Sequence, residues 1–355
     1  MRQLLVTLCF WSSNTFAQSI LPEGVGLIQV GERHFANQTN GYDDGGTYGT
    51  LANTLPGNLA GTLDQFDLGI TINAQIDATI LGVAYGLSPS WTVFAGAPYV
   101  QAHINASLIY NNADHATIDN AITNLGYAPL GPLFRTGFGD TIIGARTVLH
   151  PGAFSIEIDP TLSIPTGYTK DPSILQDVSF GTGYFTFGLA ATPKYTGSNL
   201  HAEMPLSYKA SPEGYETVRL PDDQWALSDR SHQKIVAVFP GQEVQGGLGL
   251  GWKLFMFDLD TQIGERRHFH DRYTGPDAGN YRFLSNGSGK LQVFSLTSLV
   301  FSTAELYQAK KFAIPFLLGL DYFKTLAGRN VVDESYFQLT FSTFFKTSET
   351  HTHSP

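Results

Sequence analysis

Apolar and polar residues alternate along much of the chain, and the segment from Phe154 to Ile164 shows the pattern most plainly. Apolar side chains occupy its even positions, and polar ones occupy its odd positions. A period of two predicts a β-strand with one apolar and one polar face. A soluble β-sandwich would show the same alternation, so the rest of the chain has to decide between the two environments.

Residues 138–149 are the predicted partner of this strand, joined to it by a turn at Pro151–Gly152. A two-residue turn there would place Arg146 opposite Glu157 and bring the polar residues of both strands onto one face. Because Pro-Gly is not a favoured two-residue hairpin turn, a looser loop is the alternative.

The alternation recurs in segments of about ten residues, which is the signature of strands in outer-membrane β-barrels. Strands are predicted near 24–35, 65–76, 78–87, 91–107, 138–149, 153–164, 181–194, 199–209, 233–250, 254–265, 290–303, 310–324 and 335–345. Single-chain bacterial barrels have an even number of strands, so one of these thirteen segments is wrong or one is two strands. We favour an all-β, transmembrane antiparallel barrel of 12 strands, with 14 as the alternative.

Polar residues on the inward faces of these strands are the candidates for a functional lining, because in a membrane barrel the apolar face meets lipid. The predicted lumen-lining residues are Asp67, Asn73, Gln75, Asp140, Arg146, Glu157, Asp159, Asp258, Asp260 and Asp321. Most are expected to form structural polar networks, and a minority to line a path.

Long irregular stretches at 37–64, 108–136, 211–231 and 266–289 are predicted to be extracellular loops, with the short turns on the periplasmic side. Helical spacing of apolar residues within 113–126 predicts one short helix. It would either pack on the outer loops or act as a lid or plug over the lumen.

Composition supports a membrane barrel. Charged residues make up 15% of the chain, well below the roughly 25% of soluble domains, while 37 residues are glycine and 13% are aromatic. No apolar run reaches the length of a transmembrane helix, and a net charge of −10 argues against a nucleic-acid partner.

The termini predict export. Residues 1–17 read as a secretory signal peptide, with a short positive start, an apolar stretch and small residues before a cleavage site. The one cysteine, Cys9, lies within it, which predicts a mature chain without disulfides or thiolate chemistry. Residues 18–345 would form the barrel and 346–355 a disordered tail. A barrel of this kind would lie in the outer membrane of a Gram-negative bacterium.

Three motifs carry a family resemblance: "YGLSPSWTVFAGAPYV" (85–100), "GFGDTIIGARTVL" (137–149) and "LSIPTGY" (162–168). Together they resemble the phenol-degradation-associated (MetA-pathway) outer-membrane family, which is related to the long-chain fatty-acid and aromatic-hydrocarbon transporters. The resemblance implies a barrel that carries small hydrophobic compounds across the outer membrane, and it implies no catalytic residues. The Asn-Pro-Ala plug motif of the fatty-acid transporters is absent near the N-terminus.

Other candidate chemistry is weaker. His268 and His270 in "ERRHFHDRY" (265–273) share a face in an extended chain but lack an evident third metal ligand, so we interpret the patch as a solvated loop or strand rim that contacts lipopolysaccharide. Asp43 and Asp44 lie among glycines without the ligand spacing of a calcium loop. We therefore predict no catalytic, cofactor or metal site.

Three functions remain open. The first is a channel for passive uptake of small hydrophobic or aromatic compounds. The second is a non-transporting envelope scaffold or adhesin, and the third is a lipid-modifying outer-membrane enzyme. The expected partners are outer-membrane lipid, lipopolysaccharide, a small hydrophobic substrate and the barrel-assembly machinery.

Overall fold

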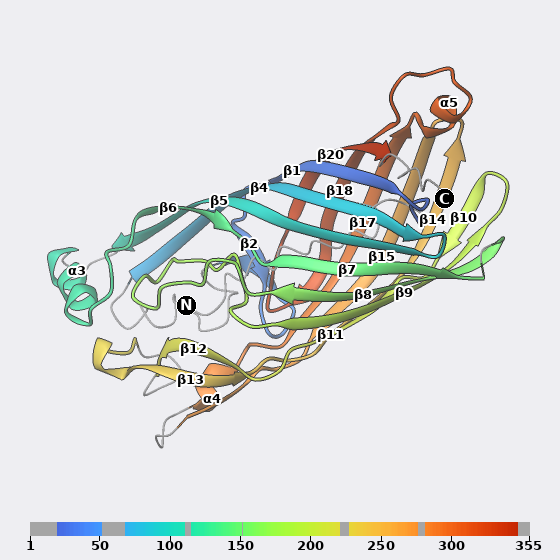
Figure 1. Cartoon of the computed structure of the whole chain (residues 1–355). Helices are drawn as coiled ribbons and strands as arrows, with labels where there is room; N and C mark the ends of the chain where they lie inside the picture. The colour runs from blue at the N-terminus through green and yellow to red at the C-terminus, as the bar shows by residue number, and fades with distance from the viewer. Residues whose placement is uncertain are drawn as a thin grey trace.

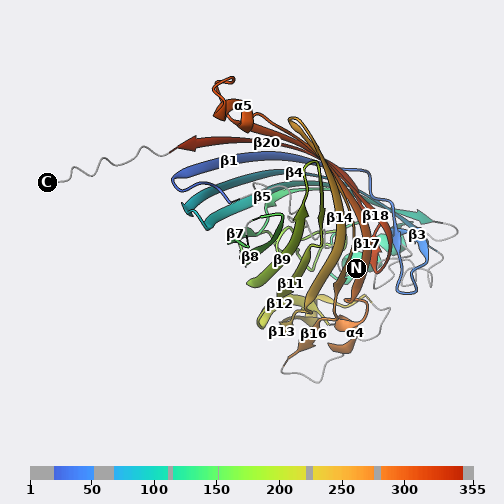
Figure 2. The ribbon, with the colours of Figure 1, turned by 90° about the vertical axis from the view of Figure 1, so that its right-hand side faces the viewer.

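The computed structural model describes residues 20–51, 68–110, 115–150, 152–220, 227–275 and 281–346, and most of them form one closed antiparallel barrel (Figures 1 and 2). The wall consists of β1 (Val25–Phe35), β4 (Leu68–Ser88), β5 (Trp91–Tyr110), β6 (Pro132–Phe138), β7 (Thr141–Leu149), β8 (Phe154–Ile164), β9 (Thr186–Thr196), β10 (Leu200–Glu203), β11 (Leu206–Ala210), β14 (Glu243–Leu254), β15 (Phe257–His268), β17 (Lys290–Ser302), β18 (Phe316–Arg329) and β20 (Ser335–Lys346). The first strand pairs with the last, and β14 pairs with β15, so no edge of the sheet is left open.

The number of strands confirms the favoured prediction of 12. The sheet contains 14 strand segments. Two pairs of these segments each form one interrupted strand. β6 and β7 both pair with β5. β10 and β11 both lie between β9 and β14 and are separated at Met204–Pro205. Counting each pair as one strand leaves 12. The surplus strand of the prediction is explained by β4, because 65–76 and 78–87 are parts of one continuous strand.

Long loops leave one end of the barrel and carry two small sheets. One sheet contains β12 (Gly214–Arg219), β13 (Gln233–Phe239) and β16 (Arg272–Thr274), and the other contains β2 (Asn40–Tyr42), β3 (Tyr48–Thr50) and β19 (Val331–Val332). The predicted helix is α3 (His115–Asn124), and the short helices η1 (Arg230–His232), α4 (Tyr281–Ser285) and α5 (Ala304–Gln308) were not foreseen. Across the described residues, every helix is too short or too polar to cross a bilayer.

The register between β7 and β8 corrects one prediction. Thr147 pairs with Ile158 and Leu149 with Ile156, which places Arg146 in line with Asp159 rather than with Glu157. The connection is longer than two residues, and its first residue, His150, has a φ of 52°. A looser loop shifts the pairing by two residues, and an even shift keeps every side chain on its predicted face.

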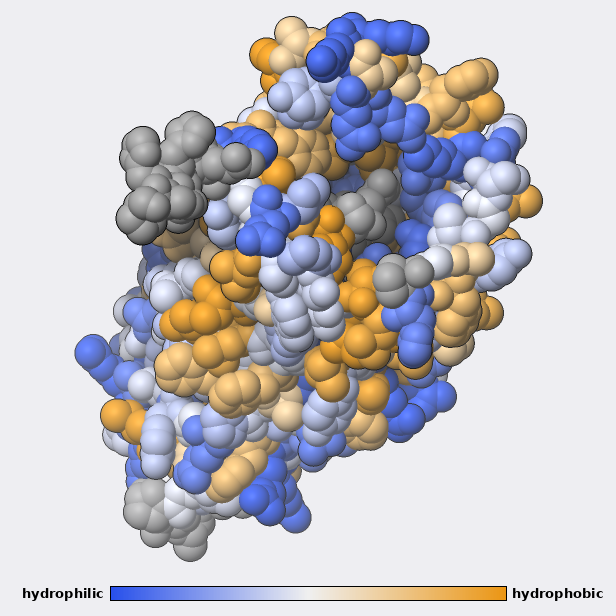
Figure 3. Space-filling model, turned by 45° about the vertical axis from the view of Figure 1, so that its right-hand side comes forward, coloured by the Kyte–Doolittle hydropathy of each residue, from blue (hydrophilic) through white to orange (hydrophobic). Residues whose placement is uncertain are grey.

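The outer face of most strands is apolar and the inner face is polar. In β20, Phe337, Leu339 and Phe341 are exposed, while the alternate residues Gln338 and Thr340 are buried inside the barrel. Figure 3 shows hydrophobic side chains on the side of the barrel, with hydrophilic ones concentrated toward the ends. This pattern suits a wall that lies in lipid.

The strands β1, β4 and β5 extend beyond this apolar band, and there the two faces exchange character. Ile72, Ala74 and Ile76 point inward and are buried, whereas Asn73 and Gln75 lie on the exposed outer face. The prediction that Asn73 and Gln75 line the lumen is therefore wrong. Outside the bilayer a strand packs its apolar face on protein and turns its polar face to water, and the alternation alone does not reveal the change.

A charge placed on each part of the outer face should separate the lipid-facing band from the water-facing extension. Leu248, near the middle of β14, is 70% exposed. We expect Leu248→Arg to lower the free energy of unfolding in bilayers by about 2–4 kcal/mol, and Gln75→Arg on β4 to lower it by only about 0–1 kcal/mol. Urea unfolding in lipid vesicles measures both values, and equal costs would contradict the assigned boundary.

Candidate functional site

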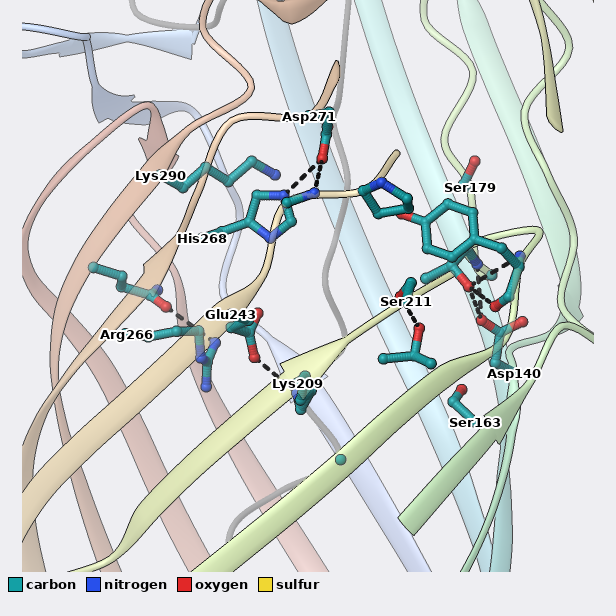
Figure 4. A pocket seen from close by; sticks show the side chains of 18 of the residues that line it. Asp140, Ser163, Ser179, Lys209, Ser211, Glu243, Arg266, His268, Asp271 and Lys290 are labelled. Carbon is teal, nitrogen blue, oxygen red and sulfur yellow. Dashed lines mark hydrogen bonds and ion pairs between the residues drawn. The ribbon is translucent and has the colours of Figure 1, made fainter. Parts of the chain in front are cut away.

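A cavity of about 230 Å³ lies inside the barrel at the end that carries the long loops, and we call it the loop-end cavity (Figure 4). It is lined by inward-facing residues of β7, β8, β9, β11, β14, β15 and β17. Residues 179–182, 184, 240–241, 330–332 and 334, which lie outside the wall strands, also line it. Ile142, Phe180 and Val331 give it apolar surface among many polar groups. The cavity therefore presents both apolar and polar groups on its surface.

Charged side chains on one side of the cavity are held by one another and by glutamines. The Lys209 ammonium donates to Glu243 Oε1 at 2.8 Å. The Arg266 guanidinium donates to Gln245 Oε1 at 3.1 Å and to Gln292 Oε1 at 3.2 Å. Figure 4 shows Lys209, Glu243 and Arg266 gathered on this side. Buried polar groups that are hydrogen-bonded in this way hold fixed positions.

Asp140 fixes the loop of residues 165–185 to the barrel wall. Its Oδ1 accepts from the Gly167 amide at 3.0 Å, and its Oδ2 accepts from the amide and hydroxyl of Thr182, each at 2.8 Å. The two ends of this loop touch, because a Cβ added to Gly167 would lie 2.6 Å from the Cα of Gly181. The Asp140 carboxylate therefore holds both ends of this loop in place beside the cavity.

Asp140→Ala should loosen this loop, since it leaves the Gly167 and Thr182 amides without their acceptor. Gly167 is half-buried and Thr182 is exposed, so each lost hydrogen bond should cost about 0.5–1.5 kcal/mol. We expect amide hydrogen exchange across 165–185 to become faster while exchange in β20 stays unchanged. Asp119→Ala, on the exposed face of α3, is the matched control. Unaltered exchange in the loop would show that the Asp140 carboxylate is not needed to hold the loop in place.

The loop covers the apolar inner face of the extended wall. Leu175, Val178 and Phe180 from the loop pack in one core cluster with Ile76 of β4 and Val100 of β5. Ile122 of α3 belongs to the same cluster. The end of α3 is also bound by Arg219 of β12, which donates to the carbonyls of Leu125 at 2.9 Å and Gly126 at 2.6 Å. The helix thus packs on the outer loops.

Three side chains, two of them from the loop, form a hydrogen-bonded group that contains a titratable tyrosine. The Tyr168 hydroxyl donates to Asp177 Oδ2 at 2.6 Å, and Arg135 donates to Asp177 Oδ1 at 3.1 Å. Burial and the neighbouring Asp177 carboxylate raise the pKa of Tyr168 to about 12.

A tyrosine whose pKa is higher in the folded chain stabilises the fold below its unfolded pKa of about 10, and the contribution is lost as the pH rises towards 12. We expect the protection of this loop from proteolysis to fall between pH 10 and 12 in the native chain. Tyr168→Phe should remove the part of this loss of protection that comes from the titration of Tyr168. A profile identical in both chains would contradict the assignment.

The other half of the lumen contains a second group of charged residues. Arg146 donates to both oxygens of Asp159, at 2.8 and 2.6 Å, and both side chains are almost fully buried. Asp321 is paired in register with Gln338, whose Oε1 accepts from Arg33 at 2.8 Å. His201 contacts Asp260, with Asp258 close by.

The first described residues pack against the inner face of the wall in this half of the barrel. The Leu21 amide donates to the Thr92 hydroxyl at 2.8 Å, and the Leu21 side chain is buried against Leu27, Ala84 and Phe94. The segment before β1 therefore lies inside the barrel wall near the short turns. Leu21 thus belongs to a small apolar cluster beside the polar groups of this half.

Of the ten predicted lining residues, the structure brings seven onto the inner face of the barrel: Asp140, Arg146, Glu157, Asp159, Asp258, Asp260 and Asp321. They form separate groups rather than one site. Asn73 and Gln75 point outward, and Asp67 lies outside the described residues.

Sequence reasoning missed Lys209, Glu243 and His201, although the segments that contain them were predicted as strands or strand ends. It also interpreted 265–273 as a solvated rim. Arg266 is instead buried in the lumen, and His268 lines the loop-end cavity with Asp271 Oδ1 at 3.0 Å. The alternation within "GERRHF" could have placed Arg266 and His268 on the inner face. His270 accepts from the Gly289 amide at 3.2 Å and does not join His268 at a common ligand.

Comparison with known proteins rests on structure alone, because no family model and no curated protein matches the sequence. The crystal structure of the COG4313 outer membrane channel from Pseudomonas putida F1 is similar with a TM-score of 0.57 and 13% identity, over 92% of this chain and 97% of that chain. The CymD monoaromatic hydrocarbon channel gives a TM-score of 0.37 at 10% identity, over 93% and 90% of the two chains. A Pseudomonas aeruginosa FadL homologue gives 0.34 at 8% identity, over 91% and 90%. The similarity to the first structure shows that this chain has the fold of an outer-membrane β-barrel.

Proposed function

We propose that the protein is an outer-membrane channel for the passive uptake of small hydrophobic or aromatic compounds. The observation that carries the proposal is the loop-end cavity, which lies inside a closed barrel wall and combines Ile142, Phe180 and Val331 with polar groups. Sites for small organic molecules combine apolar surface with polar groups at fixed positions, and the loop-end cavity offers both.

The proposed path runs from the loops into the cavity and then past the apolar cluster that contains Leu21 and Phe94. The described residues supply no nucleotide-binding or other energy-coupling element that we can identify, so movement would follow the concentration gradient. The proposal includes export by the N-terminal signal peptide, insertion by the barrel-assembly machinery, and contact with lipid and lipopolysaccharide in the outer membrane of a Gram-negative bacterium.

Uptake by cells with and without the protein tests the proposal. We would compare the initial rate of entry of an aromatic hydrocarbon with that of a sugar of similar size. Faster entry of the hydrocarbon alone is the expected result. Faster entry of both would indicate a general pore, and no change in either would refute transport.

A scaffold or adhesin is the second candidate, and one observation favours it. Tyr215 of β12 and Ile235 of β13 are 69% and 68% exposed on an outer sheet that lies beyond the barrel. Apolar side chains on water-facing loops can mark a binding surface. Binding of a partner through this sheet, with no change in uptake, would support this candidate.

A further inference from the structure

We propose that His201, Asp258 and Asp260 form a binding site for one divalent transition-metal ion of the Zn²⁺ type inside the barrel, near the end with the short turns. Their candidate ligand atoms all lie within 4.8 Å of one another. The site is distinct from the loop-end cavity, and the inference does not depend on the proposed transport function.

Strand pairing brings two of the three ligands together. His201 of β10 and Asp260 of β15 are each paired in register with Gly251 of β14, so one strand separates them. A Cβ at position 251 would lie 2.1 Å from the His201 ring and 2.2 Å from Asp260 Oδ1. Only glycine leaves room for the two side chains to meet above β14, and they are in contact there.

Asp258 completes the group from the same face of β15. It lies two residues before Asp260, and that spacing puts both carboxylates on the inner face of the strand. Its Oδ1 atom is buried and has no hydrogen-bond partner among the described residues. His201 and Asp260 therefore leave the Oδ1 atom of Asp258 without a hydrogen-bond partner.

A cation accounts for this arrangement better than the protein's own groups do. A buried carboxylate is costly unless it is paired or coordinates a metal. One imidazole cannot compensate two carboxylates. The ammonium of Lys194 acts on Asp260 through space, but it is shared with Glu203, whose carboxylate lies 3.8 Å from it. One nitrogen and two oxygens match the ligands that Zn²⁺ accepts. Magnesium and calcium prefer sites made of oxygen alone.

The sequence led us to predict no metal site, and the weak candidates that it offered were the pair His268 and His270 and the pair Asp43 and Asp44. His201 and Asp260 are 59 residues apart and meet only because the barrel places their strands on either side of β14. The aspartates of β15 were predicted to line the lumen, but His201 gave no signal of its own.

Titration with Co²⁺, a coloured substitute for Zn²⁺, tests the site in the purified full-length barrel. All samples would carry His351→Ala and His353→Ala, so that these two histidines near the end of the chain bind no metal. We expect one ion per barrel with a visible absorption band, and competition by Zn²⁺ but not by Mg²⁺. Asp258→Asn keeps the size of the side chain and should weaken binding by at least about 10-fold.

Two further variants separate a metal site from a general effect on the barrel. Gly251→Ala leaves all three ligands in place but fills the space in which they meet, and it should also weaken binding. His103→Ala removes a histidine from the exposed outer face of β5 and should leave Co²⁺ binding unchanged. Circular dichroism and a heat-dependent shift in electrophoretic mobility would show that each barrel is folded. If Gly251→Ala does not fold, Asp258→Asn decides. Absence of the band in the parent chain, or equal binding by Asp258→Asn, would overturn the proposal.

Discussion

Asp159→Ala is expected to lower the free energy of unfolding of the barrel by about 3–5 kcal/mol, because it leaves the buried Arg146 guanidinium without its counter-charge. The two side chains are only 4% and 7% exposed, and two hydrogen bonds join them. Urea unfolding in bilayers, followed by tryptophan fluorescence, measures the loss.

Replacing both partners tests the reason for this effect. In Arg146→Met with Asp159→Leu no buried charge remains, and we expect most of the lost stability to return. Lys253→Ala is the matched control, since Lys253 and Glu305 form a pair of similar length, 2.7 Å, but are 52% and 71% exposed. Lys253→Ala should lower the free energy of unfolding by at most about 1 kcal/mol. A double variant as unstable as Asp159→Ala would show that the charge is not the cause.

Ser163→Trp is expected to abolish most of the hydrocarbon uptake that the protein confers, because the indole would fill the loop-end cavity. Ser163 of β8 lines this cavity, and Ser211, just after β11, lines it from another side. Ser211→Trp should lower uptake to a similar extent, because its indole would fill the cavity from the other side. Initial rates of hydrocarbon entry into cells that express each variant at equal levels provide the measurement.

Tyr208→Trp is the matched control for these variants. Tyr208 lies on the outward face of β11, close in sequence to Ser211, and its side chain is exposed. It adds an indole to the barrel without narrowing the lumen, so uptake should stay at the parental rate. Full uptake through folded Ser163→Trp and Ser211→Trp barrels would mean that the compound bypasses the cavity.

The period-two alternation predicted the barrel, because every wall strand must divide its residues between two environments. It marked thirteen segments, and the even number of strands in such barrels favoured 12 over 14. The position of each residue in the alternation also placed Arg146, Asp159 and Asp260 on the inner face. It failed for Asn73 and Gln75, since alternation states that two faces differ but not which one meets water. The pairing of Arg146 depended on the length of a turn, which the sequence left open.

The candidate sites could be predicted only in part. Lys209 and Glu243 come from different strands and meet beside the loop-end cavity. His201 and Asp260 meet across a third strand. These contacts depend on which strands are neighbours and on how they are staggered. Neither property is encoded in the local pattern of any one segment.

The seam between β1 and β20 has a consequence for the speed of folding. Val25 pairs with Lys346 and Phe35 with Tyr336, so the pairing that closes the barrel joins the two ends of the described chain. Contacts between residues so far apart in sequence form slowly, since the entropy of closing a long loop is lost before the contact stabilises anything. Until β20 arrives, the free edges of β1 and β18 remain open to pairing with other chains. Closure of this seam is therefore the step at which correct folding and aggregation compete.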